Sequence, residues 1–337
     1  MIEIVPPELP VVSVRSLGGT VAMTTAGPGR GAAPAVSASD LVDSVPALQD
    51  IARVDAVSVA GVPSASLEFR HLLDLKAELD SACTAGAKGA VVTQGTDTME
   101  ETAFLLDLLW DRPEPLVVTG AMRTADSVGA DGPANLLAAV ATAVDPAAAG
   151  RGCLVVMNDE IHAARTVHKA HTASVAAFVS PGAGPVGRVQ EGWVLFHSTT
   201  RRTDAFDVPA GTEIARVALL RPGLADDTVL LKAAAGSYDG IVIEGMGGGH
   251  VSARWVEPLL AAAQQVPVVL ASRTGAGTVL TRTYGYPGSE QQLLGAGLTP
   301  AGDLDGLKAR ILLALAISTS GSRDSVRRAF EQRAAPR

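Results

Sequence analysis

The chain alternates short apolar runs with longer amphipathic segments, and this alternation restricts its fold more than any other feature. In the first half, nearly continuous runs of β-favouring residues occupy 11–16, 54–60, 90–93, 116–119 and 154–157. Strands that are buried on both faces have this composition. The intervening segments 67–85, 99–110 and 133–144 have helical spacing of their apolar residues. The sequence therefore predicts an α/β fold in which crossover helices join the strands of a parallel sheet.

A polar segment that begins near residue 197 separates this half from a second, shorter alternation. There we expect strands at 217–220, 240–244 and 267–271, and helices at 226–235, 251–263, 304–316 and 323–331. A chain of 337 residues is long for one domain. We therefore expect a larger domain over 1–197, a linker over 198–213 and a smaller α/β domain over 214–337.

Composition excludes several classes of function. The net charge of −8 offers no basic surface for the phosphates of nucleic acid. Two cysteines, Cys83 and Cys153, are too few for a disulfide framework or a thiolate metal site, so we expect both to be buried thiols. No apolar stretch reaches the 18 or so residues of a membrane span, and residues 1–10 lack the features of a secretory signal. The expected location is the cytoplasm.

The ligand crevice of an open parallel sheet lies beyond the carboxyl ends of its strands, so residues that directly follow strands are the first candidates for a site. Gly18 and Gly19 follow the first run and allow a sharp turn, which leaves the Thr20 hydroxyl where a nucleophile is needed. A simple turn is the alternative interpretation. The glycine-rich stretch 23–34 is long enough for a lid, and equally for an inert surface loop.

A second candidate group, Thr96 and Asp97, follows the run 90–93 and precedes a helix. Capping of that helix by Asp97 or Thr98 would explain much of the pattern, but it leaves Thr96 unexplained. A hydroxyl beside a carboxylate can bind an ammonium group and, with a nearby lysine, form a proton relay. Lys169 would supply that lysine if the fold brought it close; otherwise it is an ordinary surface charge.

Two further patterns contain residues typical of a metal site or a cofactor site, but neither has the spacing that such a site needs, so we expect no metal and no cofactor. His162, His168 and His171 with Asp159 contain zinc-ligand types but lack the spacing of a zinc-binding helix. Residues 245–250 resemble a dinucleotide-binding turn, but the sixth position is His250 and no acidic residue ends a strand about 20 residues later. The P-loop and nucleophile-elbow motifs are absent from the sequence.

Five segments taken together resemble the bacterial L-asparaginase family, and the resemblance runs in order from about residue 11 to residue 329. These segments are residues 18–22, 95–102, 120–123, 130–136 and 155–159. The resemblance implies a larger flavodoxin-like N-terminal domain and a smaller C-terminal α/β domain. It also implies a homotetramer of two intimate dimers, in which the C-terminal domain of one subunit completes the site of its neighbour.

The resemblance also implies roles for individual residues. Thr20 would be the nucleophile that attacks a side-chain amide and forms an acyl-enzyme with release of ammonia, and Thr96, Asp97 and Lys169 would form a second triad. Asp97 would hold the α-ammonium group of the substrate and Ser64 its α-carboxylate. The further substrate contacts implied by the resemblance are Ser66, Ala121, His250 and Tyr284.

The chain departs from the family at three points. Its tyrosines are Tyr238, Tyr284 and Tyr286, so the lid segment lacks the tyrosine that the family carries beside its nucleophile. Ala65 and Ser66 stand where the family has Gln and Asp, and Tyr284 aligns nearest the family's inter-subunit Glu.

These departures leave several hypotheses open. The enzyme hydrolyses asparagine or a related amide whose amino group is blocked or embedded in a larger molecule. Tyr284 or Tyr286 of the adjacent subunit replaces the missing polar contacts. The competing hypothesis is a non-catalytic homologue that binds an amino acid, although a pure sensor needs neither two hydroxyls nor a lysine.

Overall fold

The computed structural model describes residues 8–25, 32–34 and 36–334. Most of the expected lid, residues 26–31, and most of the N-terminal segment, residues 1–7, lie outside the described residues. The chain divides into two compact units, Met1–Arg202 and Thr203–Arg337. In the described part of the chain, no helix has both the length and the apolar character needed to cross a bilayer.

An eight-stranded sheet organises the first unit. Its order is β12-β11-β8-β7-β6-β5-β1-β4. Five of these strands are parallel: β4 (Arg53–Ser58), β1 (Val11–Ser16), β5 (Gly89–Thr93), β6 (Leu116–Thr119) and β7 (Cys153–Met157). The first of these strands along the chain, β1, lies between β4 and β5. The next strand, β4, is added on one side of β1, and β5, β6 and β7 are then added on the other side. The direction in which strands are added therefore reverses between β1 and β5. This is the flavodoxin-like order, whose switch point is where ligands bind. The expected α/β fold class is confirmed.

The sheet differs from the expectation at both edges. Strands β8 (Glu160–Ala163), β11 (Gly187–Gln190) and β12 (Trp193–Phe196) continue it in antiparallel fashion and were not expected. The chain reverses after β7 through Asn158 and Asp159, which both have positive φ, a conformation that asparagine and aspartate tolerate better than most residues. The expectation that every apolar run is buried on both faces was wrong for β4, because it is an edge strand and partly exposed.

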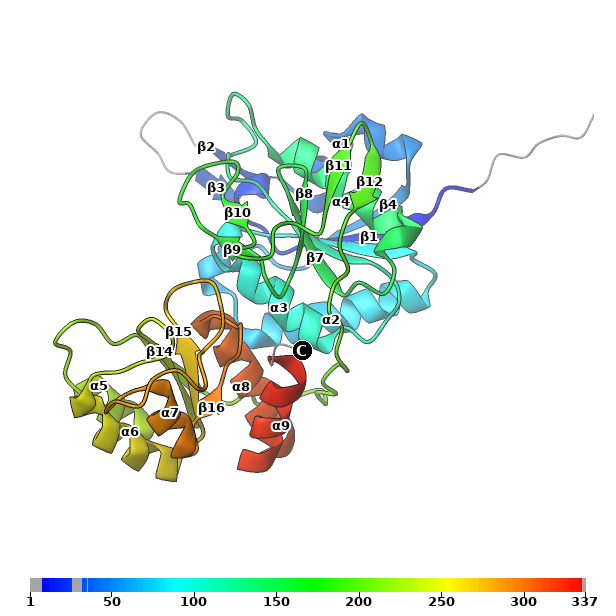
Figure 1. Ribbon diagram of the computed structural model, residues 1–337. Coiled ribbons are helices and arrows are strands. Elements are labelled where there is room, and N and C mark those ends of the chain that lie inside the picture. Colours follow the sequence, from blue (N-terminus) through cyan, green and yellow to red (C-terminus); the bar gives the residue numbers. More distant parts are fainter. Residues whose placement is uncertain (1–7, 26–31, 35, 335–337) are drawn as a thin grey trace, which may run out of the picture. The chain divides into compact units, whose positions relative to one another are not determined.

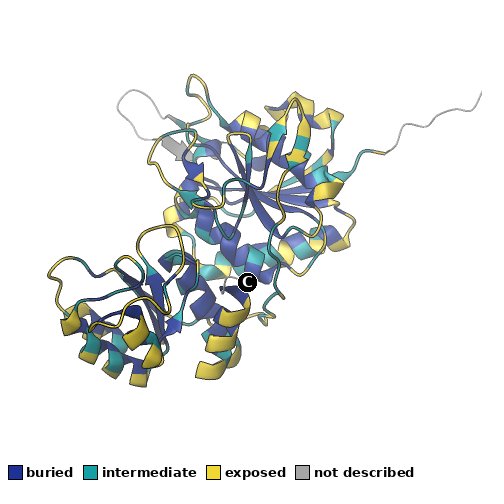
Figure 2. Cartoon of the chain, viewed as in Figure 1, coloured by how far each residue is buried: buried dark blue, intermediate teal, exposed yellow. Residues whose placement is uncertain are grey.

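Helices cover both faces of this sheet (Figure 1). Helices α2 (Phe69–Thr84) and α3 (Met99–Leu109) lie on one face, and α1 (Ala38–Asp43) and α4 (Gly132–Val144) lie on the other. Alternate residues of β1, such as Val12 and Val14, join the apolar residues of α4 in one core cluster. The central strands β1, β5, β6 and β7 are almost entirely buried between these layers (Figure 2). Cys83 and Cys153 are buried and free, as expected.

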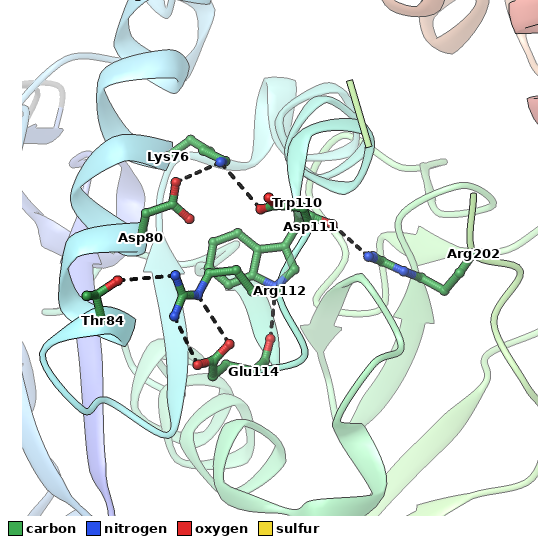
Figure 3. Close-up of polar contacts among 8 residues, drawn as sticks. All are labelled: Lys76, Asp80, Thr84, Trp110, Asp111, Arg112, Glu114 and Arg202. Carbon is green, nitrogen blue, oxygen red and sulfur yellow. Dashed lines mark hydrogen bonds and ion pairs between the residues drawn. The ribbon is translucent and has the colours of Figure 1, made fainter. Parts of the chain in front are cut away.

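A cluster of polar contacts fixes the chain after α3 (Figure 3). The Trp110 indole donates a hydrogen bond to the Glu114 carbonyl oxygen, and the Arg112 guanidinium pairs with the Glu114 carboxylate. Arg202, far along the sequence, donates to the Trp110 carbonyl oxygen at 2.6 Å. The last residue of the first unit is therefore tied to the end of α3.

The second unit contains a four-stranded parallel sheet. Its strands are, in order, β13 (Val217–Leu220), β14 (Gly240–Gly245), β15 (Val268–Ser272) and β16 (Thr299–Pro300). Helices α5 (Val229–Ala235), α6 (Ala253–Gln265) and α7 (Glu290–Gly295) contribute to one core cluster with the sheet. Helix α8 (Gly306–Ser320) contacts three of the strands, and α9 (Arg323–Arg333) packs on α8. Of these elements, α7 and β16 were not expected.

Candidate active site

The turn after β1 brings its glycines against the turn after β5, at the switch point of the sheet. Gly19 has φ 93° and ψ −176°, a combination that is essentially restricted to glycine. A Cβ at Gly19 would lie 2.0 Å from the Gly95 nitrogen, so the two backbones are in direct contact. Thr20 follows Gly19 and begins a short 3₁₀ turn, η1 (Thr20–Ala22), while Thr96 follows Gly95. The structure therefore places Thr20 beside the chain segment that carries Thr96 and Asp97.

Lys169 joins this group. It lies on the short strand β9 (His168–Lys169), which pairs with β10 (Phe178–Val179). Its ammonium group donates to Thr96 Oγ1 at 2.8 Å and to Asp97 Oδ1 at 2.7 Å. The Lys169 side chain is only 14% exposed, whereas Asp97 is 66% exposed. The lysine charge is thus held beside the threonine hydroxyl, and the aspartate remains open to a ligand.

Ser64 packs against the same turn. It begins the 3₁₀ turn η3 (Ser64–Ser66), and its buried hydroxyl accepts a hydrogen bond from the Asp97 backbone N–H at 3.2 Å. The Thr98 hydroxyl donates to the Ser64 carbonyl oxygen at 3.0 Å. The expectation that Asp97 or Thr98 caps α3 was therefore wrong: Thr98 is the N-cap residue, but neither side chain makes a capping bond. Instead, the Asp97 carboxylate accepts from Lys169 and the Thr98 hydroxyl donates to Ser64.

A buried carboxylate supports β9 from the first turn of α3. Glu100 is 5% exposed, and its Oε2 lies 2.7 Å from His168 Nδ1. His168 directly precedes Lys169, so this contact fixes the strand that presents the lysine. From the sequence alone, the favourable place of a carboxylate in the first turn of a helix is enough to explain Glu100. Glu100 lies three residues after Asp97 and His168 directly precedes Lys169 in the sequence, but no local pattern indicates that Glu100 and His168 meet.

Asp131 and Asn135 hold the loops after the next two strands. Asp131 accepts hydrogen bonds from the backbone N–H groups of Met122 and Arg123 at 3.0 and 2.9 Å. Asn135 donates to the Gly120 carbonyl oxygen and accepts from the Asn158 N–H, both at 2.9 Å. These two side chains thereby connect α4 to the loops that follow β6 and β7.

The remaining candidates of the first unit are placed differently. Ala121 is 1% exposed and its side chain belongs to the apolar core, so this side chain is not open to a ligand. Ser66 is exposed at the end of η3. Thr20 is partly exposed, and within the described residues no side chain forms a hydrogen bond with its hydroxyl.

Two residues implicated by the sequence, His250 and Tyr284, meet in the second unit, together with Tyr286 and Glu290. Glu290 is fully buried, and its Oε1 accepts from the backbone N–H groups of Thr283 and Tyr284, both at 2.8 Å. Its Oε2 lies 3.2 Å from His250 Nε2, and the Tyr286 hydroxyl lies 2.8 Å from His250 Nδ1. The Tyr284 ring packs edge-on against the imidazole at 4.9 Å between centroids.

The series of contacts from Glu290 through His250 gives Tyr286 a defined hydrogen-bonding role. Burial alone would raise the pKa of the Glu290 carboxyl, but the backbone N–H groups of Tyr284 and Thr283 and the nearby His250 together lower it. An ionised Glu290 favours the His250 tautomer with its proton on Nε2, which leaves Nδ1 as an acceptor for the Tyr286 O–H. The phenol oxygen then presents its lone pairs to solvent, in the manner of a carboxylate–histidine–hydroxyl relay.

The histidines of the first unit lie in separate environments. His162 is buried on β8, where its Nδ1 lies 3.0 Å from the Ser180 hydroxyl, and burial lowers its pKa to about 4. His168 contacts Glu100, and His171 Nδ1 accepts from the backbone N–H groups of Ala173 and Ser174. Among the described residues, no three side chains of the usual ligand types gather around one point. Residues 245–250 form a tight turn that Met246 and His250 close.

Comparison with known proteins agrees with the motifs. A family model described as Asparaginase, N-terminal matches residues 11–217, and the Glutaminase/Asparaginase C-terminal domain matches residues 216–330. The chain is 37% identical to the probable L-asparaginase of Deinococcus radiodurans, over 97% of this chain and 99% of that protein. It is 35% identical to L-asparaginase 2 of Escherichia coli, over 96% of this chain and 93% of that protein. The crystal structure of the probable cytoplasmic L-asparaginase from Campylobacter jejuni superposes with a TM-score of 0.87 at 32% identity, covering 96% of this chain and 99% of that chain.

Proposed function

Because the chain belongs to the asparaginase family, we propose that the protein hydrolyses the side-chain amide of L-asparagine to L-aspartate and ammonia. The observation that carries this proposal is the group of Lys169, Thr96 and Asp97 at the switch point of the sheet, beside the turn that presents Thr20. Two hydroxyls, an amine and a carboxylate in one place supply a nucleophile, a proton relay and a contact for an ammonium group.

In the proposed mechanism, the Thr20 hydroxyl attacks the amide carbon and ammonia leaves, which gives an ester between Thr20 and the aspartyl group. The Thr96 backbone N–H stabilises the oxyanion that forms during attack. Lys169 holds the Thr96 hydroxyl and takes part in proton transfer. A water molecule then attacks the ester and releases the acid, and the Thr20 hydroxyl is regenerated.

Asp97 and Ser64 orient the substrate in this proposal. The exposed Asp97 carboxylate binds the α-ammonium group by a charge-assisted hydrogen bond. Ser64 binds the α-carboxylate, while Ala65 and Ser66 add no ionic contact to the α-ammonium group. A charge-assisted hydrogen bond contributes about 1.5–3 kcal/mol, so this site binds free asparagine more weakly than a site that has the further ionic contact. An asparagine whose amino group is blocked or extended does not need that contact, so its affinity relative to free asparagine rises. The second candidate substrate is therefore such a modified amide.

We also propose that the C-terminal domain, residues 214–337, completes the site of a neighbouring subunit. Thr20 lacks a side-chain base within the described residues, whereas the exposed Tyr286 hydroxyl of the second unit is backed by His250 and Glu290. Tyr286 or Tyr284 of the neighbour would then supply the polar contacts that the chain's own N-terminal unit does not. This arrangement requires an oligomer, and we expect a homotetramer built from two intimate dimers, which light scattering would measure.

The expected compartment is the cytoplasm. The solved relative from Campylobacter jejuni is itself called a probable cytoplasmic L-asparaginase. Cell fractionation with an activity stain would check this expectation.

Ammonia release from L-asparagine, L-glutamine and N-acetyl-L-asparagine tests the proposed function. We expect release from at least one of the three, and its loss in the Thr20→Ala variant. Faster hydrolysis of the N-acetylated amide would identify the modified substrate class. Binding of asparagine without ammonia release by the wild-type protein would instead favour a non-catalytic amino-acid-binding homologue.

A further inference from the structure

The strand that carries Lys169 is too short to fix its own position. Strand β9 consists of His168 and Lys169, and it pairs with the equally short β10. One further backbone hydrogen bond, from the Ala170 N–H to the Ala177 carbonyl oxygen, extends the pair. A two-stranded pair by itself is marginally stable at best. The position of the Lys169 ammonium group therefore depends on contacts with other elements.

Those contacts are made with the segment that joins β5 to α3. This segment continues directly into the first turn of α3, and β9 packs against that helix (Figure 1). Lys169 donates to Thr96 Oγ1 and to Asp97 Oδ1. Glu100 lies about one turn further along, and its Oε2 is 2.7 Å from His168 Nδ1. Two adjacent residues of β9 thus attach the strand to one segment at two points.

The two attachments lie on opposite sides of β9, because successive side chains of a strand leave its backbone on opposite sides. The Lys169 contacts alone would leave the strand able to rotate about its own axis, and the Glu100 contact removes this freedom. Glu100 is 5% exposed on a helix, whereas the His168 side chain is 42% exposed. Glu100 is therefore the fixed partner, and His168 takes its position from it.

We propose that Glu100 and His168 are positioning residues, which hold the Lys169 ammonium group against the Thr96 hydroxyl. Both act through Lys169. The catalytic part of this proposal rests on the proposed function, whereas the placement of Lys169 does not. A displacement of about 1 Å at a reacting group can cost about 10²-fold in rate. Loss of the contact should therefore lower kcat although every group that takes part in the reaction is still present.

Two substitutions of Glu100 test the catalytic part. Glu100→Ala removes the contact, and Glu100→Gln keeps a hydrogen-bonding group of the same size. We expect kcat for ammonia release to fall about 10- to 100-fold in Glu100→Ala, with a smaller change in KM, and to stay close to the wild-type value in Glu100→Gln. If Glu100→Ala does not fold, His168→Ala removes the same contact at its more exposed partner and should have the same effect. Circular dichroism checks the fold of each variant.

A double-mutant cycle separates positioning from a general loss of stability. Once the lysine is gone, removal of Glu100 has nothing further to displace. The double variant of Lys169→Met with Glu100→Ala should therefore be as active as Lys169→Met alone, within about twofold. Losses that multiply in the double variant would overturn the proposal.

Thr102→Ala is the matched control on the same helix. Thr102 is also buried, but it lies two residues beyond Glu100, so its side chain points to the other side of α3. This variant should leave kcat unchanged, whatever its effect on the melting temperature. A fall in kcat equal to that of Glu100→Ala would show that any change in α3 disturbs the site, contrary to the proposal.

Amine labelling tests the placement of Lys169 independently of activity. In the wild type the ammonium group donates two hydrogen bonds and the side chain is only 14% exposed. Acetic anhydride should therefore modify Lys169 more slowly than the exposed Lys232, which serves as the internal standard. Peptide mapping by mass spectrometry should show a several-fold rise in the rate at Lys169, relative to Lys232, in Glu100→Ala.

The same labelling in the other variants completes the test. His168→Ala should also raise the rate at Lys169, whereas Glu100→Gln and Thr102→Ala should not. An unchanged rate in both Glu100→Ala and His168→Ala would overturn the proposal, and so would a raised rate with unaltered kcat. Absence of ammonia release by the wild-type protein would refute the proposed function, and the labelling would still decide whether Glu100 and His168 place Lys169.

Discussion

At the scale of single residues, Lys169 shows how little of a side chain's role its own sequence position reveals. A lysine on a two-residue strand is usually a solvated charge, but here its ammonium group is enclosed between Thr96 and Asp97. We propose that Lys169 transfers protons during catalysis. The Lys169→Met variant should then have a kcat lower by about 10²- to 10⁴-fold, with a smaller change in KM. Steady-state ammonia release measures both parameters. The exposed Lys232 gives the control variant Lys232→Met, which should retain activity.

His162 makes a different prediction, about stability. Its pKa falls from an ordinary value of 6.5 to about 4 because it is buried. Between these values the unfolded chain binds more protons than the folded one, so the free energy of unfolding should fall as the pH is lowered from 6.5 towards 4, by about 2–3 kcal/mol from this residue.

Urea unfolding at pH 7.5 and pH 5 measures this effect. His162→Gln keeps a polar contact to Ser180 without the titration, and should reduce the difference between the two pH values. His197→Gln, at an exposed histidine, should leave the difference unchanged. An equal pH dependence in the wild type and in His162→Gln would contradict this account.

At the scale of elements, the contact between the two glycine turns assembles the site. Gly19→Ala would place a methyl group 2.0 Å from the Gly95 nitrogen and put alanine in a backbone conformation restricted to glycine. The backbone strain alone costs about 1–3 kcal/mol, and relief of the clash must separate Thr20 from the β5 turn. We expect a lower melting temperature and loss of most of the activity. Gly61→Ala has open space around its Cβ and should be nearly neutral.

The sequence was sufficient to predict the elements that follow a clear period. The parallel strands and helices α2, α3 and α4 appear within a few residues of their expected bounds, because continuous apolar runs and helical spacing reflect burial directly. Strands β8, β11 and β12 were missed because they are short and partly exposed, and because β8 and β11 include polar residues. The pairing of β8 with β7 depends on the sharp turn at Asn158 and Asp159, which hydrophobic periodicity does not indicate.

The candidate site also contains residues that the sequence was sufficient to predict and contacts that it was not. Thr20, Thr96 and Asp97 were found because they follow strands, and the strand order places their turns at one switch point. The contact of Glu100 with His168 and the chain from Glu290 through His250 to Tyr286 join residues 68, 40 and 36 positions apart. Such pairs arise from side-chain packing between separate elements, so local patterns in the sequence contain no record of them.

At the scale of the whole molecule, the proposed exchange of residues between subunits predicts complementation. Thr20→Ala and Tyr286→Phe should each be impaired alone. When the two variants are mixed under conditions that allow subunits to exchange, half of the intimate dimers are mixed and each contains one intact site, so about a quarter of wild-type activity should return.

The control for this experiment replaces Tyr286→Phe with Tyr238→Phe, which should be active by itself. Unaltered turnover in Tyr286→Phe would exclude Tyr286 from catalysis. Impairment of both single variants without recovery in the mixture would place Tyr286 and Thr20 of the same chain in one site, contrary to the proposed exchange.

The central claim is that Thr20 is the nucleophile of a site completed by Thr96, Asp97 and Lys169. Its most direct test is peptide mapping by mass spectrometry after rapid acid quench of the enzyme during turnover of L-asparagine or the best amide substrate. We predict an acyl adduct on Thr20 that disappears in Thr20→Ala. An adduct on Thr96, or steady turnover by Thr20→Ala, would contradict the account.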